Sequence, residues 1–194
     1  WNERYPQATH AAYFVEPGEN RASRISMTPD IPDWTRQMLT ADGGEITQTT
    51  LPAGWRGQVW AGQATPVQAA SPTFALTRQP DGSQRLLVSP PPGARTLGLV
   101  LKSTVPLGDA TLNGRPVQEL APAGAETRIN WQVAPQGLEL NFKAAGPGAL
   151  EVGFIAVTEA WPAGAKPLPP RPADVMGFDA SDATIVGGTQ RLTW

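Results

Sequence analysis

The sequence offers few side chains that could carry out catalysis. It has one histidine, His10, and no cysteine. A Ser-His-Asp arrangement would have to use His10, which lies in a polar stretch near the start of the chain, where we expect it to be exposed. Zinc sites usually draw on several His or Cys ligands, and here at most one nitrogen ligand exists. The sequence therefore predicts no catalytic residue, no metal ligand and no cofactor in this chain.

Acidic side chains leave one catalytic alternative open. A glycosidase needs two carboxylates across a cleft, about 5–10 Å apart. The candidates by residue type are Glu16, Glu19, Glu45, Glu119, Glu126, Glu139, Glu151 and Glu159. No pair stands out among them, and Glu139 alternates outward on its strand, which favours a solvated role. Asp179, Ser181 and Asp182 do not have the spacing of a calcium-binding loop and are interpreted as a solvated turn.

The seven tryptophans are many for a chain of this size. Trp34 and Trp131 lie on apolar faces of predicted elements, so we expect them in the core. Trp55, Trp60 and Trp161 are harder to place. Exposed Trp rings on a β-sheet can stack on sugars or anchor a protein partner. These three are the predicted ligand or partner contacts.

Composition narrows the class of protein. The net charge is −2 and no basic stripe occurs, which argues against nucleic-acid binding. No run of eighteen apolar residues is present, so we expect no direct insertion of this chain into a membrane. Twenty Gly and twenty-one Pro favour short strands joined by turns.

The elements that would position these residues are mainly strands. A hairpin is predicted over residues 11–27, and a helix follows that begins near Pro32 and ends at Gly43-Gly44. Residues 127–133 and 138–142 alternate with period two and are predicted to pair as a hairpin. Leu150–Val157 is typical of a central strand, and Gly187-Gly188 is predicted to form a bulge in the last strand. Trp161–Pro172 should be extended, without internal hydrogen bonds.

Together these patterns predict a mainly β fold: a two-sheet antiparallel β-sandwich with one short α-helix near the N-terminus. We expect an N-terminal hairpin and helix over residues 1–48, packed on a sandwich over 49–162. A Pro-rich segment and a closing strand follow over 163–194. The three parts should form one compact unit.

Two segments resemble a known family. Tyr13-Phe14-Val15 and Pro32-Asp33-Trp34-Thr35-Arg36-Gln37-Met38-Leu39 form the first. Pro169-Pro170-Arg171-Pro172-Ala173-Asp174-Val175-Met176, followed by Ser181-Asp182-Ala183-Thr184-Ile185-Val186, forms the second. Both resemble the C-terminal, non-catalytic region of bacterial zinc exopeptidases of the M28 family, which are similar in layout to the endoplasmic-reticulum metallopeptidases.

The resemblance implies that catalysis belongs to other domains of a larger protein and that this chain has an accessory role. The zinc site, the peptidase domain and the membrane helices would lie upstream of Trp1, and this chain would face the periplasm. Its partners would be those upstream domains, and its role would be to pack on the peptidase domain or to gate access to it. A free-standing carbohydrate- or protein-binding β-sandwich is the alternative, and a hydrolase with a carboxylate pair is the third hypothesis.

Overall fold

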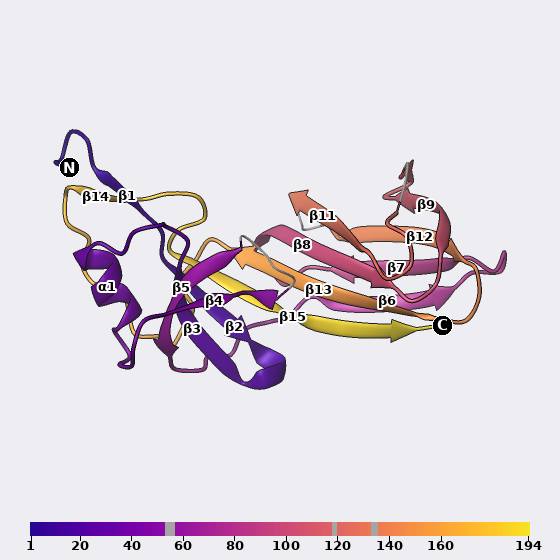
Figure 1. The fold of residues 1–194 in the computed structure, drawn as a ribbon, viewed down its shortest axis with the longest axis horizontal. Helices are drawn as coiled ribbons and strands as arrows, with labels where there is room; N and C mark the ends of the chain where they lie inside the picture. The colour runs from indigo at the N-terminus through magenta and orange to yellow at the C-terminus, as the bar shows by residue number, and fades with distance from the viewer. Residues whose placement is uncertain (53–56, 118–119, 133–135) are drawn as a thin grey trace. The chain divides into compact units, whose positions relative to one another are not determined.

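The computed structural model describes residues 1–52, 57–117, 120–132 and 136–194. Over these ranges the fold is mainly β with one short α-helix near the N-terminus, which confirms the predicted class (Figure 1). The chain forms two compact units: unit 1 is Trp1–Ala70 with Val157–Gly187, and unit 2 is Ser71–Ala156 with Gly188–Trp194. The division at residues 48 and 162 stays a prediction.

Unit 1 is built on a sheet whose strands follow the order β15-β2-β3-β5-β4. Their bounds are β2 (Ala12–Glu16), β3 (Arg21–Ser26), β4 (Thr47–Thr50), β5 (Gln58–Ala64) and β15 (Ala183–Thr193), the last of which continues into unit 2. β2 and β3 form the predicted hairpin around the 3-10 turn η1 (Pro17–Glu19). β15 runs parallel to β2, so the closing strand is paired directly with the N-terminal segment.

The helix α1 (Asp33–Leu39) starts after Pro32, as the sequence predicts. The core position predicted for Trp34 is confirmed, and Met38 and Leu39 of the same helix are buried with it. The helix ends before Gly43-Gly44, at a Thr40 whose N–H donates to the carbonyl of Arg36. Gly62 of β5 lies against this end: a Cβ there would meet the backbone of Leu39.

Two short strands, β1 (Gln7–Thr9) and β14 (Val175–Gly177), pair in parallel in unit 1. The Pro-rich segment precedes β14 and forms no strand between Trp161 and Pro172. One backbone hydrogen bond, from the Ala165 N–H to the Pro162 carbonyl, corrects the expectation that the segment has none. No helix in the described ranges has the length and apolar character needed to cross a bilayer.

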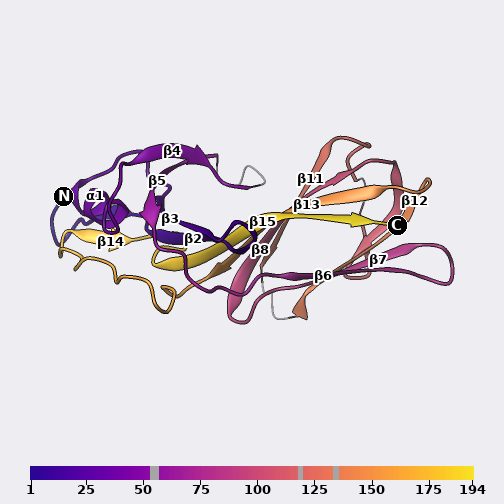
Figure 2. The same cartoon turned by 90° about the horizontal axis from the view of Figure 1, so that it is seen from below.

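Unit 2 contains two sheets. One has the order β10-β9-β12-β7-β6, and the other contains β11-β8-β13 and the end of β15. The bounds are β6 (Thr73–Arg78), β7 (Gln84–Ser89), β8 (Ala94–Ser103), β9 (Leu107–Leu112), β10 (Arg115–Pro116), β11 (Glu126–Gln132), β12 (Leu138–Ala144) and β13 (Ala149–Thr158). Figure 2 shows β6 and β7 in one layer and β13 in the other.

Aromatic contacts show that the two sheets of unit 2 face each other. The rings of Phe74 on β6 and Phe154 on β13 lie 5.3 Å apart, and those of Phe142 and Trp194 lie 5.4 Å apart. Gly188 lets the Phe154 ring approach, because a Cβ there would lie 3.0 Å from its Cζ. Whether Gly187-Gly188 forms a bulge stays a prediction.

The predicted pairing of residues 127–133 with 138–142 is wrong. β11 pairs with β8, whereas β12 pairs with β7 and β9 in the other sheet. Alternation marks which face of a strand is buried but carries no information about its neighbour. The expectation that Trp131 lies in the core is also wrong, because Trp131 and Ile129 are only half-buried. Val133 lies outside the described residues.

Glycine turns join neighbouring strands of unit 2. β6 and β7 are joined at Gly82, and β9 and β10 at Asn113-Gly114. Gly82 has a φ of 85° and Gly114 one of 75°, which glycine adopts without strain.

β13 is buried along nearly its whole length, which confirms the predicted central strand.

Candidate functional site

The predicted contact residues Trp60 and Trp161 are both half-buried in unit 1, and Trp55 lies outside the described residues. The Trp60 indole N–H donates to the Pro29 carbonyl at 3.1 Å, and its ring packs against the cluster that contains Met38 and Leu39. These contacts show that Trp60 helps to stabilise the packing of unit 1. A ligand or partner role for it stays a prediction.

Trp161 holds the start of the Pro-rich segment against the sheet. Its indole N–H donates to the Lys166 carbonyl at 3.1 Å, and its ring meets that of Tyr13 edge to face at 5.3 Å. The Arg24 guanidinium lies 5.3 Å from the Trp161 ring and 5.5 Å from that of Tyr13. A cation between two aromatic rings is a stabilising arrangement.

Arg24 is a buried charge on β3 with a single carboxylate partner. Its side chain is 0% exposed, and Nε donates to Asp42 Oδ2 at 2.6 Å. Nη2 donates to the Lys166 carbonyl at 2.8 Å, while Nη1 is buried without a hydrogen bond. Burial raises the pKa of Tyr13 above its ordinary value, and the charge of Asp42 adds to this effect. The cluster therefore fixes the Pro-rich segment onto β2 and β3.

A second arginine fixes the far end of the same segment. The Arg171 guanidinium lies over the Trp34 ring at 4.3 Å and makes two bonds to Asp182, of 2.8 and 2.7 Å. The Trp34 indole N–H donates to the Pro169 carbonyl at 3.2 Å. Hydrogen bonding from Arg171 is the main cause that lowers the pKa of Asp182 below its usual range.

His10 is the clearest correction to the sequence analysis, because it is 0% exposed, not solvated. Its Nδ1 accepts the Met27 N–H at 3.3 Å, so the neutral ring carries its proton on Nε2. Asp182 is bound to the residue next to His10, because its N–H donates to the Ala11 carbonyl. A polar local sequence did not reveal this burial, which comes from strands that meet only in the folded chain.

Ser181 and Asp182 lie in a turn before β15, as predicted, but both are half-buried and held by hydrogen bonds. Ser181 Oγ accepts the Ala11 N–H at 3.1 Å and donates to Asp182 Oδ1 at 3.0 Å. The backbone nearby is strained, with positive φ at Asp179, Ala180 and Asp182 (43°, 58° and 60°). The Asp182 N–H donates to the Ala11 carbonyl at 2.6 Å, a bond that helps hold this conformation.

The arrangement does not make a nucleophile. Both oxygens of Asp182 are bound by Arg171, and the Ser181 hydroxyl donates to that carboxylate and not to a histidine. Glu159 and Asp179 line the same hollow of about 400 Å³ as Arg171 and Asp182. No group of three or more His, Cys, Asp or Glu residues in the described ranges could hold a metal ion. These residues therefore do not fit the two-zinc site of a peptidase.

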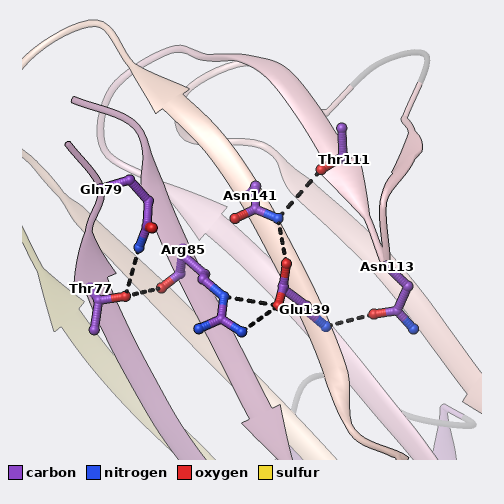
Figure 3. A network of polar contacts seen from close by, with 7 residues as sticks. All are labelled: Thr77, Gln79, Arg85, Thr111, Asn113, Glu139 and Asn141. Carbon is purple, nitrogen blue, oxygen red and sulfur yellow. Dashed lines mark hydrogen bonds and ion pairs between the residues drawn. The ribbon is translucent and has the colours of Figure 1, made fainter. Parts of the chain in front are cut away.

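Unit 2 carries a polar network on the outer face of its five-stranded sheet (Figure 3). Arg85 donates to Glu139 Oε2 through Nε at 2.8 Å and Nη2 at 2.6 Å, and the Asn141 amide donates to Glu139 Oε1 at 2.9 Å. These bonds lower the pKa of Glu139, with Arg85 as the main cause. Glu139 points outward as predicted, but it is paired across strands and does not stand alone in solvent.

Large exposed apolar side chains lie in β14 and in the segments that flank β1 and β14 along the chain. The large exposed ones in the described ranges are Trp1, Tyr5, Met176 and Phe178, at 78, 62, 46 and 44% exposure. Ala8 on β1 pairs with Met176 on β14, and the Phe178 N–H donates to the Thr9 carbonyl. We call these four residues the β1–β14 surface. Sequence reasoning missed it, although the spacing of Met176 and Phe178 about Gly177 is the period of a strand.

The rival hypotheses stay predictions, and the described residues show where some of their groups lie. A sugar platform requires two exposed coplanar Trp rings, and among the described tryptophans only Trp1 is exposed. Of the candidate carboxylates, Glu139 and Glu126 are bound to arginines, as are Glu16 and Glu151. Glu119 lies outside the described residues.

Comparisons with family models, curated proteins and solved structures found no match for this chain.

Proposed function

We propose that this chain is a non-catalytic accessory domain of an M28-type zinc peptidase, facing the periplasm, that packs on its own peptidase domain. The observation that carries the proposal is the β1–β14 surface. Large apolar side chains that remain exposed on a folded protein often mark protein contacts, and Trp and Tyr are among the residue types that anchor them. Among the described aromatic residues of unit 1, Tyr13, Trp34, Trp60 and Trp161 make contacts inside the unit.

The internal construction of unit 1 supports a docking role. Arg24 and Arg171 fix the Pro-rich segment, and the chain that leaves Arg171 leads directly into β14. A surface held from behind in this way loses little conformational freedom on binding, which favours affinity. Zinc and the residues that bind it belong, in this proposal, to the peptidase domain of the parent protein.

Hydrogen exchange would test the contact. In the full-length parent, the amides of β1 and β14 should exchange more slowly than in this chain alone. Replacing both Met176→Ser and Phe178→Ser should remove that extra protection and lower or deregulate peptidase turnover. The exposed residue Ala75 of unit 2 offers the control Ala75→Ser, which should leave protection intact.

Two results would overturn the proposal. Equal exchange of β1 and β14 in the parent and in the isolated chain would remove the docking contact. Stoichiometric zinc binding with aminopeptidase turnover by the chain alone would show that it is itself catalytic.

A further inference from the structure

Two polar residues of unit 2 occupy positions where the strand pattern calls for apolar ones. On β6, Phe74 and Leu76 face inward, and Arg78 follows with the same period. On β7, Gln84 lies on the same face as the buried Leu86 and is itself only 4% exposed. Arg78 and Gln84 are direct partners in the ladder and lie side by side, with Gln84 buried and Arg78 exposed at the end of its strand.

In the described part of the chain, no side-chain partner holds the polar groups of Arg78 and Gln84. In the ranges that the structure describes, Arg78 makes no ion pair, and neither Arg78 nor Gln84 forms a side-chain hydrogen bond. Arg85 on the outer face of the same sheet provides the contrast, because its guanidinium is satisfied by Glu139 (Figure 3). The Gln84 amide and the Arg78 guanidinium are not among the buried unpaired groups of the described chain, so both remain open to a polar ligand from the solvent side.

A cavity lies next to this pair. Its volume is about 460 Å³, within the usual range for small-molecule sites. Arg78 and Gln84 share its lining with apolar groups: Leu76, Ala144, Pro147 and Trp194. All of these residues belong to unit 2.

The aromatic wall of the cavity is fixed in advance. The Trp194 indole N–H donates to the Gly146 carbonyl at 2.8 Å, and its ring packs against that of Phe142. Gly148 accommodates the ring, since a Cβ there would lie 3.2 Å from the Trp194 Cζ2. Because these contacts already fix the Trp194 ring, it loses little conformational entropy when a flat ligand binds against it.

We propose that this cavity binds a small aromatic monocarboxylate. The Arg78 guanidinium binds the carboxylate, the Gln84 amide donates a further hydrogen bond, and the ring of the ligand packs against Trp194 and Leu76. Charge selects an anion, because no acidic residue lines the cavity. This site is independent of the proposed docking role, which uses residues of unit 1.

Calorimetry and proton–nitrogen correlation NMR on the full chain would test the site, with phenylacetate as the probe and phenylacetamide as its neutral match. Phenylacetate should bind saturably and shift the Gln84 side-chain amide and the Trp194 indole N–H. Phenylacetamide should bind about tenfold more weakly or not at all, because it lacks the charged bond to Arg78.

Two variants test the binding site directly, and a third serves as a control for net charge. Arg78→Gln should weaken phenylacetate binding about tenfold and abolish the preference for the anion. Ala144→Leu should fill the cavity and block both probes. Arg36→Gln changes the net charge equally from an exposed helix position in unit 1 and should leave binding unchanged.

Some outcomes would overturn the proposal. They are the absence of saturable binding, equal affinity for acid and amide, or shifts confined to residues outside the cavity. Unchanged affinity in a folded Arg78→Gln protein would do the same.

Discussion

The ion pair of Arg24 and Asp42 should be the most sensitive electrostatic contact in unit 1. Asp42→Asn keeps the size of the side chain but leaves the Arg24 guanidinium, whose side chain is 0% exposed, without a carboxylate. Among the described residues, the Lys166 carbonyl, the Tyr13 and Trp161 rings and the neutral amide oxygen of the new side chain remain to stabilise the charge. Removing one partner of a buried pair typically destabilises by about 3–5 kcal/mol. We expect the lower end, about 3 kcal/mol, because the Asp42 side chain is 10% exposed.

Urea unfolding measures this loss. With a slope of about 2 kcal/mol per molar urea, the midpoint of unit 1 should fall by about 1.5 M. Hydrogen exchange of the β2 and β3 amides should accelerate in parallel, which assigns the effect to unit 1.

A double variant and a surface pair supply the controls. Arg24→Met together with Asp42→Asn should be more stable than Asp42→Asn alone, because it removes the unpaired charge and keeps an apolar side chain between the rings. Glu126→Gln breaks the pair with Arg128, whose side chains are 53 and 54% exposed, and should change stability by less than about 0.5 kcal/mol. The reasoning fails if Asp42→Asn stays within about 1 kcal/mol of the unaltered protein, or if the double variant is no better than Asp42→Asn.

Three further predictions follow from single sites. The pKa of Asp182 is lowered in the folded chain, so its contribution is complete above about pH 4 and is lost as pH falls through the folded pKa. Acid titration of stability should therefore be shallower for Asp182→Asn than for the unaltered protein, and identical slopes would contradict the assignment. Gly62→Ala should lower the melting temperature strongly, because the new Cβ meets the backbone of Leu39, whereas Gly18→Ala has open space and should change it little. Leu140→Ala, at a position that is 0% exposed, should reduce the unfolding free energy of unit 2 by about 2–5 kcal/mol in denaturant titration; a loss below about 1 kcal/mol would show that this core is loose.

Local signals in the sequence were sufficient for most elements. The helix at Asp33–Leu39, the hairpin of β2 and β3 and the turns at Gly82 and Gly114 depend on residues close together in the chain. The conformational preferences of Pro, Asn and Gly act over a few positions, so they can be recognised without any tertiary information.

Pairing and burial required the folded chain. β11 and β12 alternate in the same way, yet they belong to different sheets. His10 and Asp182 looked solvated because their sequence neighbours are polar, and both are held by residues from distant segments.

The sequence by itself determined the class of the fold, because the period of the apolar residues and the turn residues are properties of short segments. Only the tertiary structure decided which side chains meet. It placed Arg24 and Arg171 on the Pro-rich segment, Arg78 and Gln84 on the wall of a cavity, and Met176 beside β1. Those contacts join residues far apart in the chain, and their energies depend on distance in space, which no spacing along the sequence encodes.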